Sequence, residues 1–334
     1  MGDGVLIDFA PPITIAAVTP IARGGKSSLE LQLRNAEAIP LSGEIHTRLE
    51  GLPGGRQAAA FSVADAGSKT IELPALDADI SPDRVYNAVI DCKLQKGSDV
   101  TQSFHVDFLQ APKLRSILVI DGSQSAWSEI RGAVLAGRDA VTRRPDLWTG
   151  NNDLSATVKY AWDDHALYLF VDATDDEFYQ EKTGFDTWNG DCVQLGIDID
   201  NGKAILNTGN ELEDQKSQHR WSEFTLALTK NGPEVYRTGS YNTDLFKVAQ
   251  VPLSAISLSV IRSNNHTIYE AAIPWRMLGK DDRPWTGERL GVALSVNDID
   301  SASQLEPKAV GLFGGMNGHK DMNDYGVLTL GAGN

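Results

Sequence analysis

The chain has 334 residues, which is room for about two domains of ~150 residues each. Its 41% hydrophobic and 22% charged residues are ordinary for a globular protein and argue against long disordered regions. The net charge of −15 would repel nucleic-acid phosphates and anionic membrane surfaces, and no apolar run approaches the ~18 residues of a transmembrane helix. We therefore expect no nucleic-acid partner and no membrane insertion, while neutral ligands and divalent cations remain open.

Residues 1–112 are predicted to form a first β-sandwich. Short segments such as 29–33 and 85–94 alternate apolar and polar residues, and Gly- and Pro-rich turns such as 51–55 separate them. About seven segments at this spacing are typical of an antiparallel sandwich. The pattern resembles immunoglobulin-like or fibronectin-type domains without a diagnostic motif. Pro112 ends the last ladder and marks the junction.

Residues 113–334 are also rich in predicted strands. Residues 156–162 and 166–173 alternate on either side of Asp163-Asp164, which predicts a hairpin. Further strands are expected at 193–199, 223–229, 256–261, 267–273, 290–296 and 326–330, with short helical pieces at 127–136 and 275–279. We predict an all-β protein of two antiparallel β-sandwich domains, 1–112 and 113–334, of which the second is larger and resembles a jelly roll.

Five stretches in the second half stand in a distinctive order. They are Ile120-Asp121-Gly122 before Trp127, the hairpin 159–171, Trp188-Asn189-Gly190-Asp191, and the segments 269–275 and 296–300. Together they resemble carbohydrate-binding module family nine and its DOMON-like relatives, over about residues 116–332. The resemblance implies a non-catalytic domain that binds a neutral mono- or polysaccharide on tryptophan faces. It also implies polar side chains that bind the hydroxyl groups, and calcium ions that support the loops.

The resemblance assigns the sugar platform to Trp188, from its place before Gly190-Asp191. Gln194 stands where the family usually has glutamate, and an amide can still donate to and accept from hydroxyls. The residues that alternate with Gln194, namely Val193, Leu195 and Ile197, should face the core. The other candidate ligand-binding residues are Asp191, Arg220, Glu223, Glu270, Asn297 and Phe313. Phe313 is the candidate second aromatic platform, because no tryptophan follows Trp285.

Acidic residues that follow predicted strands are candidate calcium ligands. They are Asp172, Asp175, Asp198, Asp200, Asp298 and Asp300. Calcium gathers six to eight oxygens from loops, whereas aspartate is also common in solvated turns, so both roles remain open. The stretch that begins at Asp198 has Gly209 rather than glutamate at the twelfth position and is not an EF-hand.

Three other functions remain open. A protein-binding scaffold or adhesion domain that has lost the sugar site is the main alternative. A glycoside hydrolase or lyase needs two carboxylates that face one cleft, and a haem-binding module needs an axial Met/His or His/His pair. The first residues lack the pattern of a signal peptide. We therefore expect a secreted, periplasmic or cell-surface location only as part of a longer chain, which could carry further domains.

Overall fold

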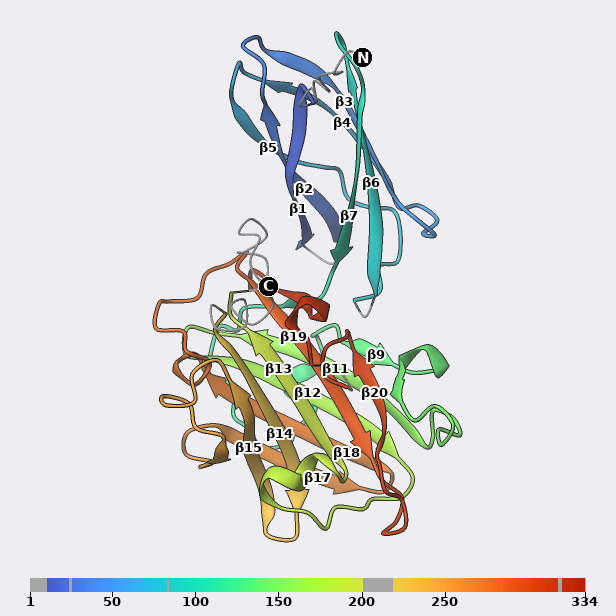
Figure 1. The fold of residues 1–334 in the computed structure, drawn as a ribbon, viewed down its shortest axis with the longest axis vertical. Coiled ribbons are helices and arrows are strands. Elements are labelled where there is room, and N and C mark those ends of the chain that lie inside the picture. The colour runs from blue at the N-terminus through green and yellow to red at the C-terminus, as the bar shows by residue number, and fades with distance from the viewer. Residues whose placement is uncertain (1–10, 24–25, 83, 201–218, 318–319, 334) are drawn as a thin grey trace, which may run out of the picture. The chain divides into compact units, whose positions relative to one another are not determined.

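The computed structural model describes residues 11–23, 26–82, 84–200, 219–317 and 320–333 (Figure 1). Over these residues the chain is built from strands and short 3-10 turns, without an α-helix, and this confirms the all-β prediction. The helical piece expected at 275–279 is a 3-10 turn, η4 (Trp275–Leu278). The one expected at 127–136 was wrong, because the 3-10 turn η1 (Ser125–Trp127) ends where it should begin and Ala133–Leu135 form a strand. In the described part of the chain no helix is long and apolar enough to cross a bilayer. The chain divides into two compact units, Met1–Phe108 and Leu109–Asn334.

The first unit contains a pair of antiparallel sheets. One has the order β1 (Ile13–Arg23), β2 (Lys26–Asn35), β5 (Ser68–Glu72), and the other β4 (Arg56–Val63), β3 (Leu41–Leu49), β6 (Val85–Leu94), β7 (Val100–Asp107). Leu29, Leu31 and Leu33 alternate along β2 and are fully buried. They share one core cluster with Ile45 and Ile90 of the other sheet. An immunoglobulin-like identity for this unit stays a prediction.

The second unit is a larger sandwich of two sheets. The path of the nine-stranded sheet is β10 (Val141–Arg143), β20 (Lys308–Leu312), β19 (Arg289–Asp298), β13 (Cys192–Asp198), β14 (Trp221–Thr229), β15 (Gly232–Ser240), β16 (Ala249–Val251). Strand β21 (Gly326–Leu330) also pairs with β19, and β8 (Gln110–Ala111) pairs with β21. The order of the five-stranded sheet is β17 (Ser257–Ser263), β18 (His266–Pro274), β12 (Ala166–Asp175), β11 (Leu154–Trp162), β9 (Ala133–Leu135).

The core of the second unit lies between its sheets. Val193, Leu195 and Ile197 of β13 are fully buried in one cluster with residues of β11, β12, β18 and β19, as their alternation predicted. Trp162 and Trp275 belong to the same cluster. Because side chains alternate along a strand, Gln194, which stands between Val193 and Leu195, faces the opposite, outer side of the nine-stranded sheet.

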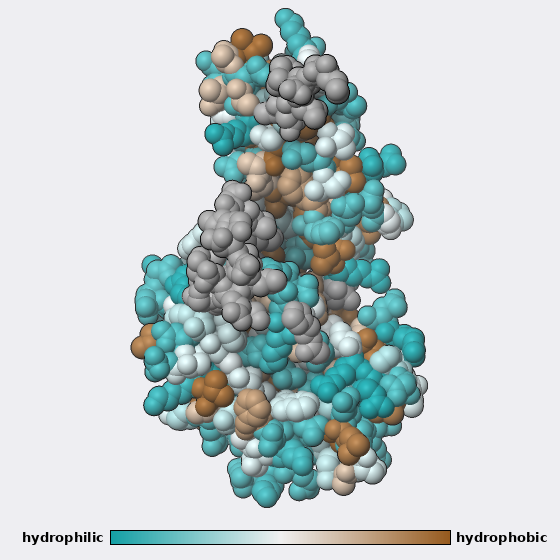
Figure 2. Space-filling model, viewed as in Figure 1, coloured by the Kyte–Doolittle hydropathy of each residue, from teal (hydrophilic) through white to brown (hydrophobic). Residues whose placement is uncertain are grey.

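On the face of the larger unit in Figure 2, the described hydrophobic side chains lie scattered among hydrophilic ones, as is normal for a monomer surface. The sequence pattern missed β15, which contains Pro233 and Gly239, and β20, which contains Gly311. Proline and glycine weaken the strand signal, although both strands pair within the sheet, β20 in continuous register with β19 and β15 with one register shift against β14.

Candidate functional site

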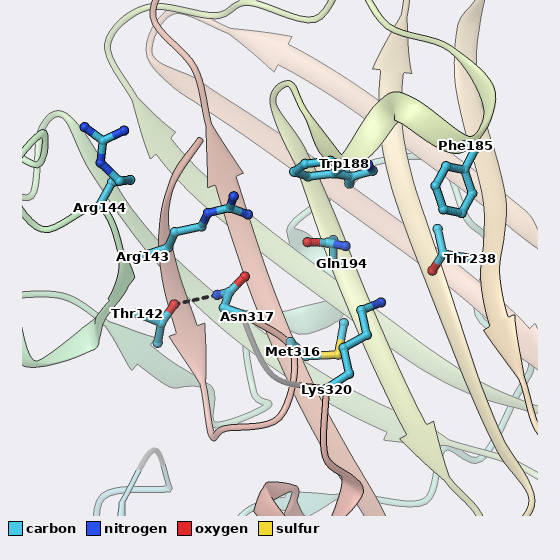
Figure 3. A pocket seen from close by; sticks show the side chains of 10 residues that line it. All are labelled: Thr142, Arg143, Arg144, Phe185, Trp188, Gln194, Thr238, Met316, Asn317 and Lys320. Atoms are coloured by element: carbon cyan, nitrogen blue, oxygen red, sulfur yellow. Dashed lines mark hydrogen bonds between the residues drawn. The ribbon is translucent and has the colours of Figure 1, made fainter. Parts of the chain in front are cut away.

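The outer face of the nine-stranded sheet carries a pocket of about 610 Å³. Trp188 lies above Gln194, which comes from β13, while Arg143 and Phe185 lie on opposite sides of them (Figure 3). The lining residues are Thr142, Arg143, Arg144, Phe185, Trp188, Gln194, Thr238, Met316, Asn317 and Lys320.

The two aromatic side chains of the pocket come from one 3-10 turn, η3 (Gly184–Trp188). Gly184 begins the turn at φ 67°, a conformation that glycine adopts without strain, and its N–H donates to Glu234 Oε1 at 2.6 Å. At the other end, the Trp188 carbonyl accepts from Asn297 Nδ2 at 2.8 Å. Residues three apart on a 3-10 turn lie on the same side, which directs Phe185 and Trp188 together toward the pocket.

The Gly190-Asp191 pair after Trp188 joins this turn to the sheet. A Cβ at Gly190 would lie 2.5 Å from Oε1 of Gln180. The Gln180 amide nitrogen donates to the Asp191 carbonyl at 3.1 Å. The Asp191 carboxylate accepts from the backbone N–H groups of Tyr179 and Ile299 at 2.8 and 2.9 Å. Glycine leaves room for the glutamine and aspartate ties two loops together, so the motif fixes the platform.

The floor of the pocket is a chain of hydrogen-bonded polar side chains. Asn297 Nδ2 donates to Gln194 Oε1 at 3.0 Å, which orients the Gln194 amide so that its nitrogen can donate to a ligand. Ser295 Oγ donates to Asn297 Oδ1 at 2.8 Å. Asn317 Nδ2 donates to Ser295 Oγ at 3.0 Å and to Thr142 Oγ1 at 2.7 Å. The floor is therefore held in one arrangement before a ligand binds.

Two groups on the Phe185 side of the pocket are suited to contact a ligand. The Phe185 side chain is 52% exposed and packs edge-to-face on Tyr236, with ring centroids 6.1 Å apart. Thr238 Oγ1 is buried without a hydrogen-bond partner among the described residues. Since buried polar atoms in proteins are normally hydrogen-bonded, this hydroxyl points to a missing polar partner such as a ligand hydroxyl.

The structure brings together three of the predicted ligand-binding residues, Trp188, Gln194 and Asn297. Glu223 lies beside them, buried and in contact with the Lys320 ammonium. Phe185 was not predicted, although its spacing of three residues from Trp188 was a usable signal.

The remaining predicted ligand residues lie elsewhere. Glu270 is on the five-stranded sheet, fully buried, and accepts from Trp127 Nε1 at 2.8 Å and from the Gly122 N–H at 2.7 Å, so it serves the fold. Arg220 pairs with Asp200 at 2.6 Å. The Phe313 ring packs over Gly326, within 2.4 Å of where a Cβ would lie, and is not a pocket residue. Asp191 lies in the acidic group described next.

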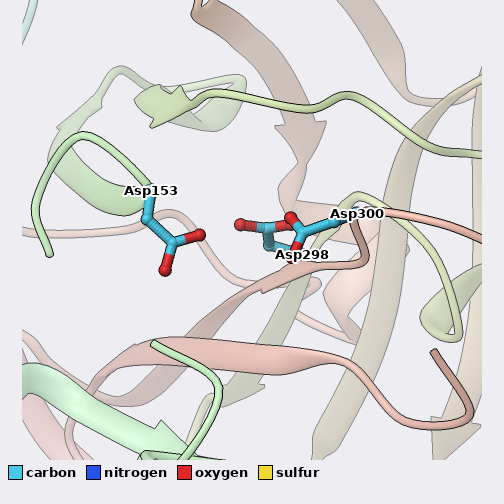
Figure 4. A group of neighbouring side chains, drawn as sticks. All are labelled: Asp153, Asp298 and Asp300. Carbon is cyan, nitrogen blue, oxygen red and sulfur yellow. The ribbon is translucent and has the colours of Figure 1, made fainter. Parts of the chain in front are cut away.

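Five aspartates at strand ends form two overlapping acidic groups in the second unit. Asp153, Asp298 and Asp300 form one (Figure 4), and Asp175, Asp191 and Asp298 form the other, with carboxylate oxygens within 4.8 Å in each. The first group already holds a cation. The fully buried Lys308 ammonium lies 2.5 Å from Asp153, 3.3 Å from Asp298 and 2.6 Å from Asp300.

The two groups together have an excess of negative charge. Lys308 and Arg262, which is 2.8 Å from Asp175, are two cations against five carboxylates, and full ionisation would leave a net charge of −3. Neither carboxylate oxygen of Asp298 has a hydrogen-bond partner among the described residues. Burial and the nearby Asp191 raise the pKa of Asp298 to about 10, and burial raises the pKa of Asp191 well above its ordinary value. Three buried carboxylates, of which Asp298 has both oxygens without a hydrogen-bond partner among the described residues, fit a hard divalent cation.

The predicted metal ligands are thus distributed over three places. Asp175, Asp298 and Asp300 lie in the acidic groups, together with Asp153, which was not predicted, and Asp191, which was predicted to bind the sugar rather than a metal ion. Asp172 instead contacts His266 Nδ1 at 2.8 Å. Asp198 lies 3.4 Å from His219. Asp200 accepts hydrogen bonds from Arg220, and these lower its pKa although burial acts in the opposite direction.

A β-sandwich with an aromatic and amide-lined pocket on one sheet face has the form of a carbohydrate-binding module. Residues 124–332 match the model of the family described as carbohydrate family 9 binding domain-like, and the chain belongs to this family. The match confirms the resemblance seen in the sequence. The domain is a non-catalytic carbohydrate-binding module.

Two curated relatives are a glucanase and a xylanase. The chain is 27% identical over 214 residues to exoglucanase XynX of Acetivibrio thermocellus, covering 64% of this chain and 16% of that protein. It is 28% identical over 181 residues to endo-1,4-beta-xylanase A of Thermoanaerobacterium saccharolyticum, covering 54% of this chain and 13% of that protein. The chain therefore spans less than a fifth of either relative, and in both the matching region is one module of a larger glycoside hydrolase.

Similar solved structures include a family 9 module from Caldicellulosiruptor kristjanssonii, in complexes with glucose and with cellotriose. Both are 15% identical with a TM-score of 0.48, cover 67% of this chain, and are themselves covered to 95% and 93%. A putative carbohydrate-binding protein from Bacteroides uniformis is 11% identical with a TM-score of 0.46, over 66% of this chain and 98% of that one.

Proposed function

We propose that the pocket around Trp188 is the sugar-binding site of this module. A pyranose ring has an apolar C–H face and an edge of hydroxyls, and it would lie against the Trp188 indole with Phe185 beside it. The Gln194 amide nitrogen and the Thr238 hydroxyl would bind the hydroxyl edge. The observation that carries this proposal is the hydrogen-bonded η3 turn, which directs two aromatic side chains over a fixed polar floor.

The ligand class that we propose is a neutral mono- or polysaccharide of the glucan or xylan type. The names of the relatives, a glucanase and a xylanase, support this choice, as do the glucose and cellotriose complexes of a family member. We further propose that the chain is an accessory region of a larger secreted, periplasmic or cell-surface protein that acts on polysaccharide.

The proposal includes a structural calcium ion held by Asp175, Asp191 and Asp298. Calcium takes carboxylate oxygens, and its charge would offset the excess of negative charge at this point. Asp175 ends β12 of one sheet, whereas Asp298 ends β19 of the other and Asp191 precedes β13. Such an ion would therefore tie the two sheets together and hold the start of β13, the strand that carries Gln194.

Isothermal titration calorimetry of the intact chain with cello- and xylo-oligosaccharides tests the sugar site. We expect saturable binding that Trp188→Ala abolishes while the melting temperature stays nearly unchanged. Trp285→Ala is the matched control, because Trp285 is 59% exposed and lies outside the pocket. If folded wild-type protein binds no saccharide, the pocket is not a sugar site. That result would favour the alternative function, a protein-binding scaffold or adhesion domain.

A further inference from the structure

The rim of the pocket is positively charged in a strongly acidic chain. Three of its ten lining residues, Arg143, Arg144 and Lys320, are cations and none is a carboxylate. The whole chain, by contrast, has 45 acidic and 30 basic residues. A pocket with charge of one sign raises the local concentration of ligands of the opposite sign.

Arg143 is the cation best placed to contact a ligand. Its guanidinium carbon lies 5.5 Å from the centroid of the Trp188 ring, and its tip points toward the space between Trp188 and Gln194 (Figure 3). The guanidinium makes no hydrogen bond to the described residues, and its ionic neighbour Glu306 lies 3.8 Å away. The side chain is 25% exposed, so water covers it only in part.

The other two cations already have close partners. Arg144 holds both carboxylate oxygens of Asp146, at 3.0 and 2.8 Å, and its guanidinium points away from Trp188 (Figure 3). Lys320 is paired with the buried Glu223. Arg143 therefore differs from its sequence neighbour in having donors to spare beside the aromatic platform.

We infer that the pocket prefers sugars that carry a carboxylate, the uronic acids, and that Arg143 binds this carboxylate; the inference rests on the proposed sugar site. A uronic acid differs from its neutral hexose only in bearing a carboxylate where the hexose bears a hydroxymethyl group. The ring still stacks on Trp188, while the planar guanidinium offers two parallel donors to the carboxylate. Neutral sugars still bind through Trp188 and Gln194, with lower affinity.

The test compares a xylo-oligosaccharide with one glucuronic acid branch against the same oligosaccharide after reduction of the carboxyl to hydroxymethyl. Calorimetry should show about tenfold tighter binding of the acid. Arg143→Gln should bring the affinities for the two ligands within about twofold of each other. Arg143→Lys should keep part of the preference because it keeps the charge but not the fork, and Arg144→Gln should keep all of it.

Each outcome separates this inference from the proposed function. Equal affinity of the wild type for both ligands overturns the uronate preference, while continued binding of the reduced ligand leaves the sugar site standing. Loss of the preference in Arg144→Gln as well as Arg143→Gln overturns the assignment to Arg143. Absence of binding to either ligand overturns the sugar site itself. Melting temperatures of the variants check that each is folded.

Discussion

Replacing Asp298 by asparagine should stabilise the metal-free protein and remove its stabilisation by calcium. Asp298 is shared by both acidic groups, is 1% exposed, and its oxygens accept no hydrogen bond from described residues. The asparagine side chain has nearly the same shape and is always neutral, so folding no longer requires a proton to be bound by a buried carboxylate. It also removes one of the three carboxylates that would hold the ion.

The size of the calcium effect follows from mass action. A ligand that binds only the folded state adds about 2.7 kcal/mol at a concentration of one hundred times its Kd. One kcal/mol shifts the melting temperature of a 150–250-residue domain by about 2–4 °C. Wild-type protein should therefore melt about 5–11 °C higher in saturating calcium than in EDTA, and Asp298→Asn should show almost no difference.

The calcium effect should also grow with pH. Because the pKa values of Asp191 and Asp298 are raised in the folded protein, it retains protons that the unfolded chain has lost above about pH 4. The metal-free protein therefore loses this part of its stability as the pH rises toward 10. Calcium displaces these protons, so the calcium-dependent rise in melting temperature should be larger at pH 8 than at pH 5.5.

Differential scanning calorimetry in calcium and in EDTA measures these shifts. Asp172→Asn is the matched control, because Asp172 contacts His266 outside the acidic groups and should leave the calcium effect intact. A wild-type melting temperature that is the same in calcium and in EDTA would refute the reasoning. So would an Asp298→Asn variant that is less stable than wild type in EDTA.

Three further substitutions separate the sugar site from the fold. Phe185→Ala should weaken oligosaccharide binding by about 1 kcal/mol, measured by calorimetry, without a change in melting temperature, because the ring is half exposed; unchanged affinity would remove Phe185 from the site. Glu270→Gln should lower the free energy of unfolding by about 2–3 kcal/mol in urea denaturation, since it disturbs acceptors for buried N–H groups. Its sugar affinity should stay that of wild type, and a loss would show that the five-stranded sheet takes part in binding. Gly190→Ala should lower the free energy of unfolding by about 1–3 kcal/mol in the same denaturation assay and also weaken oligosaccharide binding, because its Cβ would displace Gln180. A variant with wild-type stability and affinity would show that Gly190 is not needed to hold the η3 turn against the sheet.

The strands of the core were predictable because their signal is local. A strand such as β13 alternates apolar and polar residues, and the same alternation that turns Val193 into the core places Gln194 on the outer face, where it lines the pocket. Strand β20 was not predictable, because its lysine at 308 is fully buried and only the aspartates around it explain that burial. Those aspartates come from two other segments of the chain.

Apart from Asn297, which lies in the segment 296–300 that carries the family resemblance, the site was predicted only where its residues are neighbours in sequence. Trp188 and Gln194 follow one another around a single motif, and Phe185 lies on the same turn. Arg143 stands on β10, which reaches the pocket through the pairing of β10 with β20 and of β20 with β19. Likewise Asp153 joins the acidic groups from the turn before β11. Such contacts depend on sheet order, which no local pattern encodes.

The most direct test of the account is the indole region of a ¹H–¹⁵N NMR spectrum recorded while an oligosaccharide is added. The chain has seven tryptophans, and each contributes one indole N–H signal, of which Trp188→Phe identifies the one that belongs to Trp188. We predict that the Trp188 signal shifts progressively and saturates, while those of the buried Trp127, Trp162 and Trp275 stay in place. A Trp188 signal that does not move while another indole signal titrates would contradict the account.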